Sequence, residues 1–290
     1  MSSKLKAIRL SFVALTLLLV AIPIAAKDGE SKYATLEGAK IHYQSYGGNG
    51  KDAFVLVHGW GCQLGYWKYQ IPELAKRARV IALDLPGHGQ SDKPQITYTI
   101  DHFAAAIDAV LRDAKVERAV LLGHSMGTPV ARQFYRKYPA KTLAIVIVDG
   151  GLRPFGTKEL REQFLNSFRA ASYKEAGAQM FNQMTPVLAS GDKAPVIASM
   201  QSTPQNVLVS AMESMNDEAL YATDKINVPV LAVLAKSPFW PADTEEFFRS
   251  LAPDFEFHMW DGVDHFLMME KPKEFNETVV AFVNKKNLFK

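Results

Sequence analysis

Cysteine is almost absent from this 290-residue chain, whose only thiol is that of Cys62. A single cysteine excludes an intrachain disulfide. Spacings typical of metal ligands and of phosphate-binding loops are missing as well, so we expect neither a metal nor another cofactor. Because nothing in the sequence points to a reactive thiol, we expect Cys62 to be buried and inert.

An excess of charge of one sign is also lacking. The formal net charge is +3, and the first nine positions alone hold three basic residues, Lys4, Lys6 and Arg9, with no acidic residue. The remainder of the chain therefore has balanced charges, which gives no electrostatic reason to expect nucleic-acid binding. The length is sufficient for one large hydrophobic core with a small lid.

A long apolar run follows the basic residues at the N-terminus. Residues 10–20 are apolar except for two hydroxyl side chains, and Pro23 and the small pair Ala25-Ala26 come next. This layout predicts a secretory signal peptide over residues 1–26, with cleavage after Ala26. The mature protein would then be periplasmic or secreted, without stable membrane association. An uncleaved N-terminal anchor is the alternative.

Short apolar strands alternate with helical patterns through most of the remaining chain. The strands predicted from dense apolar runs lie at 39–46, 53–58, 80–83, 119–122, 143–148, 228–234 and 255–260. The helices predicted from the spacing of apolar residues lie at 100–114, 126–138, 245–251 and 272–283. Near-continuous apolar strands separated by helices are typical of an α/β protein, with a mostly parallel sheet and helices on both faces.

Strand patterns disappear between residues 152 and 221, where Met and Phe recur at helical spacing. We predict that residues 152–221 form a helical cap, inserted between the two parts of a core formed by residues 27–151 and 222–290. Such a cap would cover the mouth of a site at the end of the sheet. Met and Phe at this spacing are also common in ordinary packing, and this alternative stays open.

The most specific motif is G-H-S-M-G at 123–127, which stands between a predicted strand and a predicted helix. A nucleophile elbow requires this context. The sharp turn forces Ser125 into a strained backbone conformation, and glycines at 123 and 127 avoid clashes with neighbouring elements. The hydroxyl then stands clear of the sheet, at the positive end of a helix. Ser125 is the candidate nucleophile.

A serine nucleophile needs a base, and the chain has seven histidines. His265 lies in a loop after the last predicted strand, at the same end of the sheet as Ser125. It also follows the serine in the chain order nucleophile, acid, base. His124 adjoins the serine, but its side chain should point away from it. We expect the histidines of other loops and elements to be dispensable for the chemistry: His42, His88, His102 and His258.

The oxyanion that a serine attack generates needs two backbone N–H donors. Met126, directly after the nucleophile, is one candidate. The loop H-G-W-G at 58–61 would supply the second, most naturally from Trp60, because its glycines permit close approach.

Four motifs now resemble those of the α/β-hydrolase superfamily, and the resemblance covers residues 33–288. They are H-G-W-G (58–61), D-L-P-G-H-G-Q-S (84–91), G-H-S-M-G (123–127) and G-V-D-H-F (262–266), in this order. The chain is similar to the capped esterase, lactonase and carbon–carbon hydrolase branches. Serine at 125 argues against the haloalkane dehalogenase and epoxide hydrolase branches, whose nucleophile is aspartate.

The acid of the triad is missing from its usual place in that superfamily. It would follow the predicted strand 228–234, but the sequence there is A-K-S-P-F-W. Asp149, at the end of strand 143–148, is the favoured candidate, and Asp243 is the alternative. Each could instead have a purely structural role, since Asp149 could serve a turn and Asp243 could cap a helix. Asp264 adjoins His265 too closely, and a chain with no acid remains the third possibility.

The resemblance implies an exported serine hydrolase that cleaves a small apolar carboxylic ester or lactone through an acyl-enzyme. Phe155, Phe239 and Trp240 lie in loops expected at the same end of the sheet and are candidates for the substrate pocket. Carbon–carbon bond hydrolysis or perhydrolysis by the same triad is the alternative. A ligand-binding protein on the same scaffold, without turnover, is another. The sequence gives no indication of oligomeric state.

Overall fold

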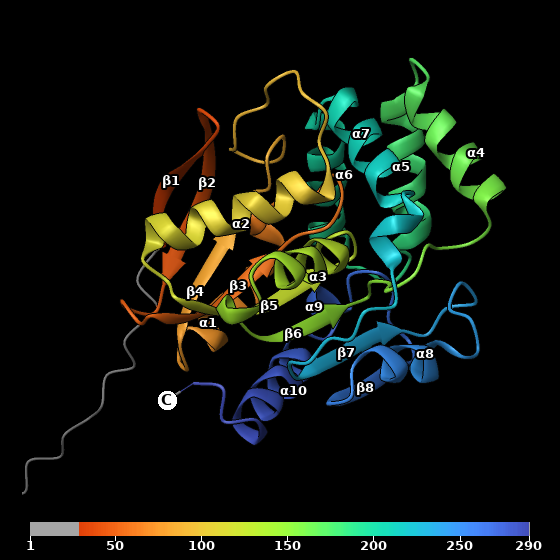
Figure 1. Cartoon of the computed structure of the whole chain (residues 1–290). Coiled ribbons are helices and arrows are strands. Elements are labelled where there is room, and N and C mark those ends of the chain that lie inside the picture. Colours follow the sequence, from red (N-terminus) through yellow and green to blue (C-terminus); the bar gives the residue numbers. More distant parts are fainter. Residues whose placement is uncertain (1–28, 290) are drawn as a thin grey trace, which may run out of the picture.

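The computed structural model describes residues 29–289 of the chain. The predicted signal peptide, residues 1–26, therefore lies outside the described residues. Strands and helices alternate along the chain, a run of helices follows the sixth strand, and the alternation resumes near residue 230 (Figure 1). This is the order that the apolar patterns predict.

Eight strands form one sheet in the order β1-β2-β4-β3-β5-β6-β7-β8. Only the pairs β1–β2 and β2–β4 are antiparallel, and all other neighbours are parallel. The strands are β1 (Glu30–Leu36), β2 (Ala39–Tyr46), β3 (Asp52–Val57), β4 (Arg79–Leu83), β5 (Arg118–His124), β6 (Thr142–Val148), β7 (Val230–Ala235) and β8 (Phe255–Trp260).

The central strands are buried on both faces, as their continuous apolar sequences predict. Every residue of β4 and of β7 is buried. This burial follows from helices on both sides of the sheet, and the predicted fold class is confirmed. The strand β1 was not among the predicted strands, because only Ala34 in it is fully buried and its other side chains are partly or fully exposed. It joins the edge of the sheet through a hairpin with β2.

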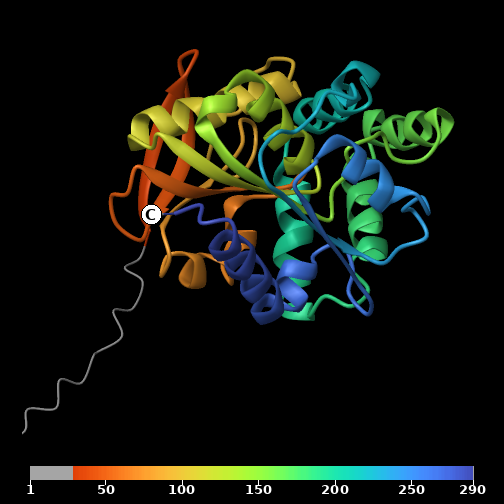
Figure 2. The same ribbon diagram turned by 60° about the horizontal axis from the view of Figure 1, so that its bottom comes forward.

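Helices α2 and α3 lie on one face of the sheet, and α1 and α10 lie on the other (Figures 1 and 2). The side chain of Thr99 accepts a hydrogen bond from the N–H of His102 and so caps the start of α2. The helices of the α/β part are α1 (Ile71–Leu74), α2 (Ile100–Ala114), α3 (Gly127–Lys137), α8 (Thr244–Leu251), α9 (Leu267–Glu270) and α10 (Pro272–Lys285).

Between β6 and β7, residues 152–221 form a helical segment beyond the carboxyl ends of the parallel strands (Figure 1). Its helices are α4 (Lys158–Arg169), α5 (Tyr173–Met184), α6 (Ser190–Ser202) and α7 (Gln205–Met215). The last of these is fixed to the start of α2, because Ser210 and Ser214 accept hydrogen bonds from the backbone of Tyr98 and Ile100 at 3.0 and 2.9 Å.

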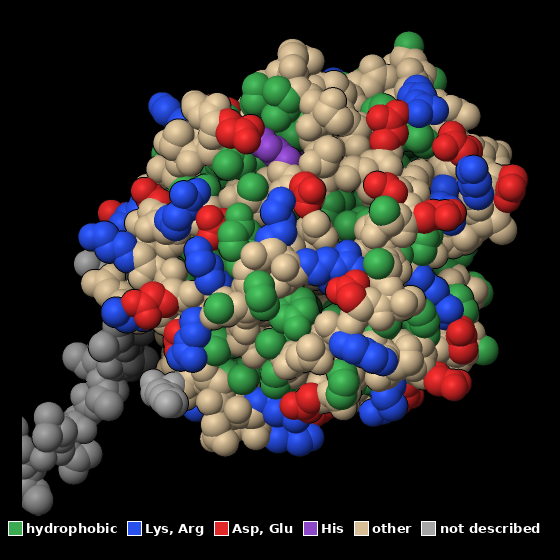
Figure 3. Space-filling model, in the orientation of Figure 1, with side chains coloured by type: hydrophobic (Ala, Val, Ile, Leu, Met, Phe, Trp, Pro, Cys, Tyr) green, Lys and Arg blue, Asp and Glu red, His purple; other side chains and the backbone are tan. Residues whose placement is uncertain are grey.

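The surface of the described part carries charges of both signs. Figure 3 shows Lys and Arg interspersed with Asp and Glu over the face that it presents. Among residues 29–289, no helix combines the length and the apolar character that crossing a bilayer requires.

Candidate active site

Ser125 occupies a sharp turn between β5, which ends at His124, and α3, which begins at Gly127. Its φ of 53° lies in the left-handed region, which non-glycine residues rarely adopt. A Cβ atom at Gly123 would lie 2.3 Å from the carbonyl oxygen of Gly127, and one at Gly127 would lie 2.4 Å from that of Val57. Both glycines are therefore required by close backbone approach, as the motif predicts.

The loop that carries Trp60 passes directly over the serine. A Cβ atom at Gly59 would lie 3.1 Å from the Cβ of Ser125. Within residues 29–289, neither the backbone N–H of Trp60 nor that of Met126 donates a hydrogen bond to the protein. These two N–H groups thus have free donor capacity beside the half-buried Ser125, as the donors of an oxyanion hole must.

The structure brings His265 and Asp149 together. Nδ1 of His265 lies 2.6 Å from Oδ2 of Asp149, and the carboxylate is only 8% exposed. Such a contact holds an imidazole in one orientation and one tautomer, with the proton on Nδ1. The other ring nitrogen, Nε2, is then the one able to accept a proton.

Asp149 reaches this place because the chain turns sharply after β6, where its φ is 43°. Its second oxygen, Oδ1, accepts a hydrogen bond of 2.9 Å from the backbone nitrogen of Ala235, the last residue of β7. The carboxylate therefore originates from β6 but is held by the end of β7. The next residue, Lys236, pairs with Asp261 at 3.0 Å and takes no part in this contact.

Asp243, the alternative acid, lies elsewhere. Its carboxylate pairs with the guanidinium of Arg153, with hydrogen bonds of 3.1 and 2.5 Å, and its side chain is 56% exposed. The hydrogen bond from Arg153 lowers the pKa of Asp243 below its usual value. Although Asp243 stands at the N-cap of α8, its side chain makes no capping hydrogen bond. It does not contact His265.

His124 contributes to the site in a way that its place in the sequence did not suggest. Its Nε2 lies 2.8 Å from the carbonyl oxygen of His265, and the two rings lie 4.7 Å apart. Burial lowers the pKa of His124 well below its usual value, so the ring is neutral and donates its Nε2 proton. The side chain next to the candidate nucleophile thus supports the backbone of the candidate base. The adjacency of His124 to Ser125 in the sequence was the only available signal.

Aromatic side chains from the helical segment pack on Trp60. Phe168 of α4 meets its indole edge-on with ring centroids 4.6 Å apart, and Phe164 lies at 5.9 Å. The indole nitrogen of Trp60 donates to the carbonyl oxygen of Leu208 at 2.9 Å. The side chain of Trp60 is therefore held by two aromatic rings of α4, which we call the apolar roof together with Trp60, and by a backbone carbonyl of α7.

The three predicted pocket residues are more exposed than Trp60 and Phe168. Phe155 is 46% exposed but contacts Phe164 edge-on at 6.1 Å. Trp240 is partly buried, and its indole nitrogen donates to the carbonyl oxygen of Ala235 at 3.0 Å. Phe239 is 77% exposed. The structure does not bring Phe239 into the apolar roof, and its role in a pocket stays a prediction.

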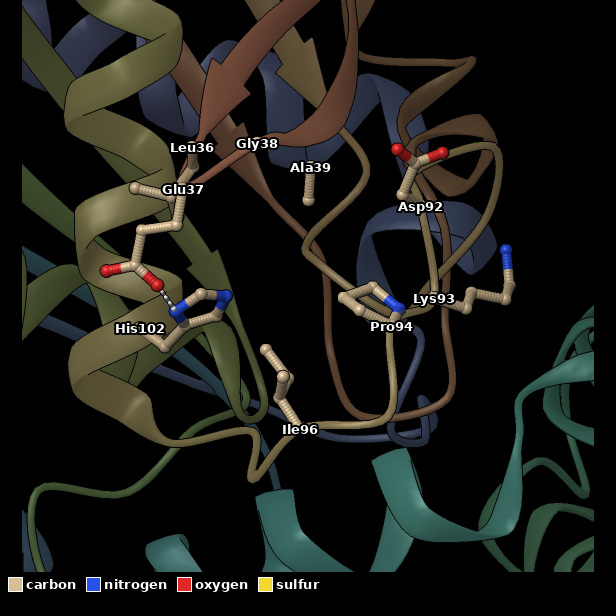
Figure 4. A pocket seen from close by; sticks show the side chains of 9 residues that line it. All are labelled: Leu36, Glu37, Gly38, Ala39, Asp92, Lys93, Pro94, Ile96 and His102. Atoms are coloured by element: carbon tan, nitrogen blue, oxygen red, sulfur yellow. Dashed lines mark ion pairs between the residues drawn. The ribbon is translucent and has the colours of Figure 1, made fainter.

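A surface pocket of about 550 Å³ lies at a different edge of the molecule (Figure 4). It is formed by the turn between β1 and β2, the loop around Pro94 and the start of α2, and none of the candidate catalytic residues lines it.

The thiol of Cys62 is buried as predicted, and its burial raises its pKa. No cluster of three metal-ligating side chains occurs among residues 29–289.

Comparisons with known proteins bear on the fold of the chain. A sequence profile of the alpha/beta hydrolase fold matches residues 52–190. A dihydrolipoyllysine-residue acetyltransferase component of the acetoin cleaving system from Pseudomonas putida is 29% identical over 266 residues, which are 87% of this chain and 69% of that protein. Several other curated relatives match over about a third of their own length.

One of these shorter matches is epoxide hydrolase 1 of Caenorhabditis elegans, which is 30% identical over 119 residues, 40% of this chain and 30% of that protein. Among solved structures, Est816, described as an N-acyl homoserine lactone degrading enzyme, superposes with a TM-score of 0.73 and 27% identity. It matches 87% of this chain and 100% of its own.

Proposed function

The chain belongs to the α/β-hydrolase superfamily, and we propose that it is an exported serine hydrolase that cleaves a small apolar carboxylic ester or lactone. Ser125 would be the nucleophile, His265 the base and Asp149 the acid. The observation that carries this proposal is the 2.6 Å contact between His265 Nδ1 and the buried carboxylate of Asp149. That contact supports Asp149 as the acid in place of one after β7, and it favours an enzyme over a binding protein without turnover.

The chemistry follows from these positions. Nε2 of His265 takes the proton of the Ser125 hydroxyl as its oxygen attacks the carbonyl carbon. The backbone N–H groups of Met126 and Trp60 stabilise the oxyanion of the tetrahedral intermediate, and His265 returns the proton to the leaving alkoxide. A water molecule, activated by the same imidazole, then hydrolyses the acyl-enzyme and restores the serine.

Serine at position 125 favours acyl substrates over epoxides. An oxygen nucleophile that opens an epoxide forms a bond to a saturated carbon. With a carboxylate, the product is an ester, which water can hydrolyse at its carbonyl. With serine, the product would be an ether without a carbonyl, and turnover would stop. The epoxide hydrolases among the relatives are therefore a weaker guide to this chain than the esterases and lactonases.

The surroundings of the site favour an apolar acyl group. The rings of Trp60, Phe164 and Phe168 pack on one another, and Trp60 follows Gly59, whose backbone lies against Ser125. Apolar lining with a few polar groups is typical of small-molecule sites. That Est816 is described as degrading a lactone with an acyl chain supports the inclusion of lactones.

The test is covalent labelling with a fluorophosphonate, which reports an activated serine without knowledge of the substrate. We expect the wild-type protein to be labelled at Ser125, as peptide mapping would show, and Ser125→Ala to remain unlabelled. Hydrolysis of p-nitrophenyl esters and of N-acyl homoserine lactones of increasing chain length would then define the acyl pocket. Turnover of styrene oxide without labelling would contradict the proposal.

Export is supported by the sequence of residues 1–26 alone. Intact-mass measurement on protein recovered from the periplasm or the medium should give a mature chain that begins at Lys27. A cell-associated protein with the mass of the whole chain would favour the uncleaved anchor instead.

A further inference from the structure

The loop that carries His265 is hydrogen-bonded to the turn between α5 and α6 of the helical segment. Oδ2 of Asp264 accepts hydrogen bonds from the backbone nitrogens of Val187 at 2.8 Å and of Leu188 at 3.4 Å. The backbone nitrogen of His265 itself donates to the carbonyl oxygen of Met184 at 3.3 Å. We call these three hydrogen bonds the clasp.

The clasp involves the residue directly before the candidate base, so a movement of the turn acts on His265 through one peptide unit. The turn is also anchored in the interior, because Leu188 is buried although Val187 is exposed. The side chain of Asp264 points to the helical segment and not to the imidazole. This explains why Asp264 does not compete with Asp149 for His265.

Other contacts join the helical segment to the core without involving the loop of His265. Near α2, Ser210 and Ser214 of α7 accept backbone hydrogen bonds. At the start of α6, Asp192 pairs with Lys68 at 2.5 Å and accepts a hydrogen bond from Tyr69 at 3.1 Å. The clasp differs from these in that it ends on the catalytic loop.

We propose that Asp264 is a positioning residue, which holds His265 in its productive place through its hydrogen bonds to the turn between α5 and α6. The proposal rests on the proposed function, since it assigns His265 the role of base.

Glu270 holds the backbone of Asp264, the residue at the centre of the clasp. The backbone nitrogen of Asp264 donates to Oε2 of Glu270 at 2.8 Å. Burial and the neighbouring carboxylates of Asp264 and Asp149 raise the pKa of Glu270 to about 8. The titratable groups that face it are thus these two carboxylates, with His265 bonded to one of them, and no Lys or Arg pairs with Glu270 in the described chain. The raised pKa favours the protonated form of Glu270, which adds no further negative charge beside Asp264.

Two substitutions at position 264 separate positioning from general stability. Asp264→Ala removes both hydrogen bonds from the turn, whereas Asp264→Asn keeps an oxygen that can accept them. Asp192→Ala is the matched control, because it removes a carboxylate that joins the helical segment to the core without touching the catalytic loop. The readouts are amide hydrogen exchange at Val187 and Leu188, and separate values of kcat and KM on a p-nitrophenyl ester.

We expect Asp264→Ala to accelerate exchange at the two amides and to lower kcat about tenfold, the scale of a lost hydrogen bond to a charged acceptor. KM should change little, since Asp264 does not line the apolar roof. Asp264→Asn should restore the slow exchange and most of kcat, and Asp192→Ala should keep kcat within about twofold of the wild type.

Three results would overturn the proposal: unchanged exchange in Asp264→Ala, faster exchange with unchanged kcat, or equal loss of kcat in Asp264→Ala and Asp192→Ala. The exchange measurement does not depend on turnover. A wild-type protein that is not labelled at Ser125 would therefore refute the proposed function separately, while the exchange rates would still show whether the clasp exists.

Discussion

Asp149 and His265 are 116 residues apart in the chain, yet their side chains meet at 2.6 Å at the carboxyl ends of the strands. The contact is specific because the carboxylate is held on its other side by the backbone nitrogen of Ala235. A carboxylate in this place fixes the tautomer of the imidazole and stabilises the imidazolium that forms during acyl transfer.

Replacing the two candidate acids tests this assignment directly. Asp149→Asn keeps the shape but presents an amide to Nδ1, so the imidazole would be held in the wrong tautomer. We expect kcat for ester hydrolysis to fall by about 10³–10⁴. Asp243→Asn breaks only the exposed pair with Arg153 and should leave kcat near the wild-type value. A larger loss in Asp243→Asn than in Asp149→Asn would reverse the assignment.

The histidines provide a second comparison. His265→Ala should abolish labelling by a fluorophosphonate, because it removes the imidazole that Asp149 holds and that we propose as the base of Ser125. His88→Ala should label at the wild-type rate but unfold more easily, by about 1–3 kcal/mol, since its ring is buried between His58 and Phe103. Burial lowers the pKa of His88 to about 3, so the ring is neutral and structural. Labelling of His265→Ala at Ser125 would exclude this histidine as the base.

His258→Ala extends that comparison to the surface, because His258 pairs with Glu256 at 3.2 Å on β8 and is half-exposed. The labelling rate and the midpoint of urea unfolding of the His258→Ala variant should both match those of the wild type. A drop in labelling here would show that a histidine outside the proposed triad contributes to the chemistry.

Glu270 makes the stability of the protein depend on pH. Its folded-state pKa of about 8 lies above the ordinary value of 4.5, so the folded state binds this proton more tightly than the unfolded state. The resulting stabilisation is complete below about pH 4.5 and is lost as the pH rises through 8. Glu270→Gln has no ionisable proton at this position. We therefore expect its free energy of unfolding to increase relative to that of the wild type as the pH rises from 5 to 9.

Urea unfolding at pH 5, 7 and 9 would measure that gain. Asp243→Asn serves as the control, because the pKa of Asp243 is lowered by Arg153 and its titration lies below this range. The difference between this variant and the wild type should therefore be the same at all three pH values. A constant difference for Glu270→Gln as well would show that Glu270 is already ionised at pH 5.

Much of the fold was predictable because the central strands have a recognisable sequence pattern. Residues 143–148 and 228–234 are continuous apolar runs, and burial on both faces of a parallel sheet requires such runs. The strand β1 was not predictable in the same way, because it lies at an antiparallel edge and keeps much of its surface exposed. An exposed edge strand imposes little pattern on its residues.

The site divides along similar lines. The turn around Ser125 was predictable because a short motif records the two glycines that close backbone approach requires, although the neighbour of Gly127 is Val57 of β3. Asp149 could be proposed from the strand end it follows, but only the packing of β7 beside β6 shows that Ala235 holds its carboxylate. The roles of His124 and Asp264 depend on partners more than 70 residues away, and no local pattern encodes such contacts.

The last prediction concerns Gly150, which follows Asp149 where β6 passes the serine turn. A Cβ atom there would lie 2.0 Å from Oγ1 of Thr128 and 2.8 Å from the carbonyl oxygen of Ser125. Thr128 is buried and bonded to Gly123 at 2.9 Å, so it has no room to move aside. We expect Gly150→Ala to lower the free energy of unfolding by about 3 kcal/mol. It should also reduce kcat, because a shift of this backbone changes the position of Asp149, and with it His265, relative to Ser125.

Gly191→Ala is the matched control for that substitution. A Cβ atom at Gly191 has no neighbour within 4 Å, and the residue lies in the first turn of α6. Alanine there should leave kcat unchanged and stabilise the protein by up to about 0.5 kcal/mol, since it restricts the unfolded chain more than glycine does. If Gly150→Ala were as stable and as active as Gly191→Ala, the end of β6 could not lie against the serine turn. The assignment of Asp149 to the triad would then lose its structural basis.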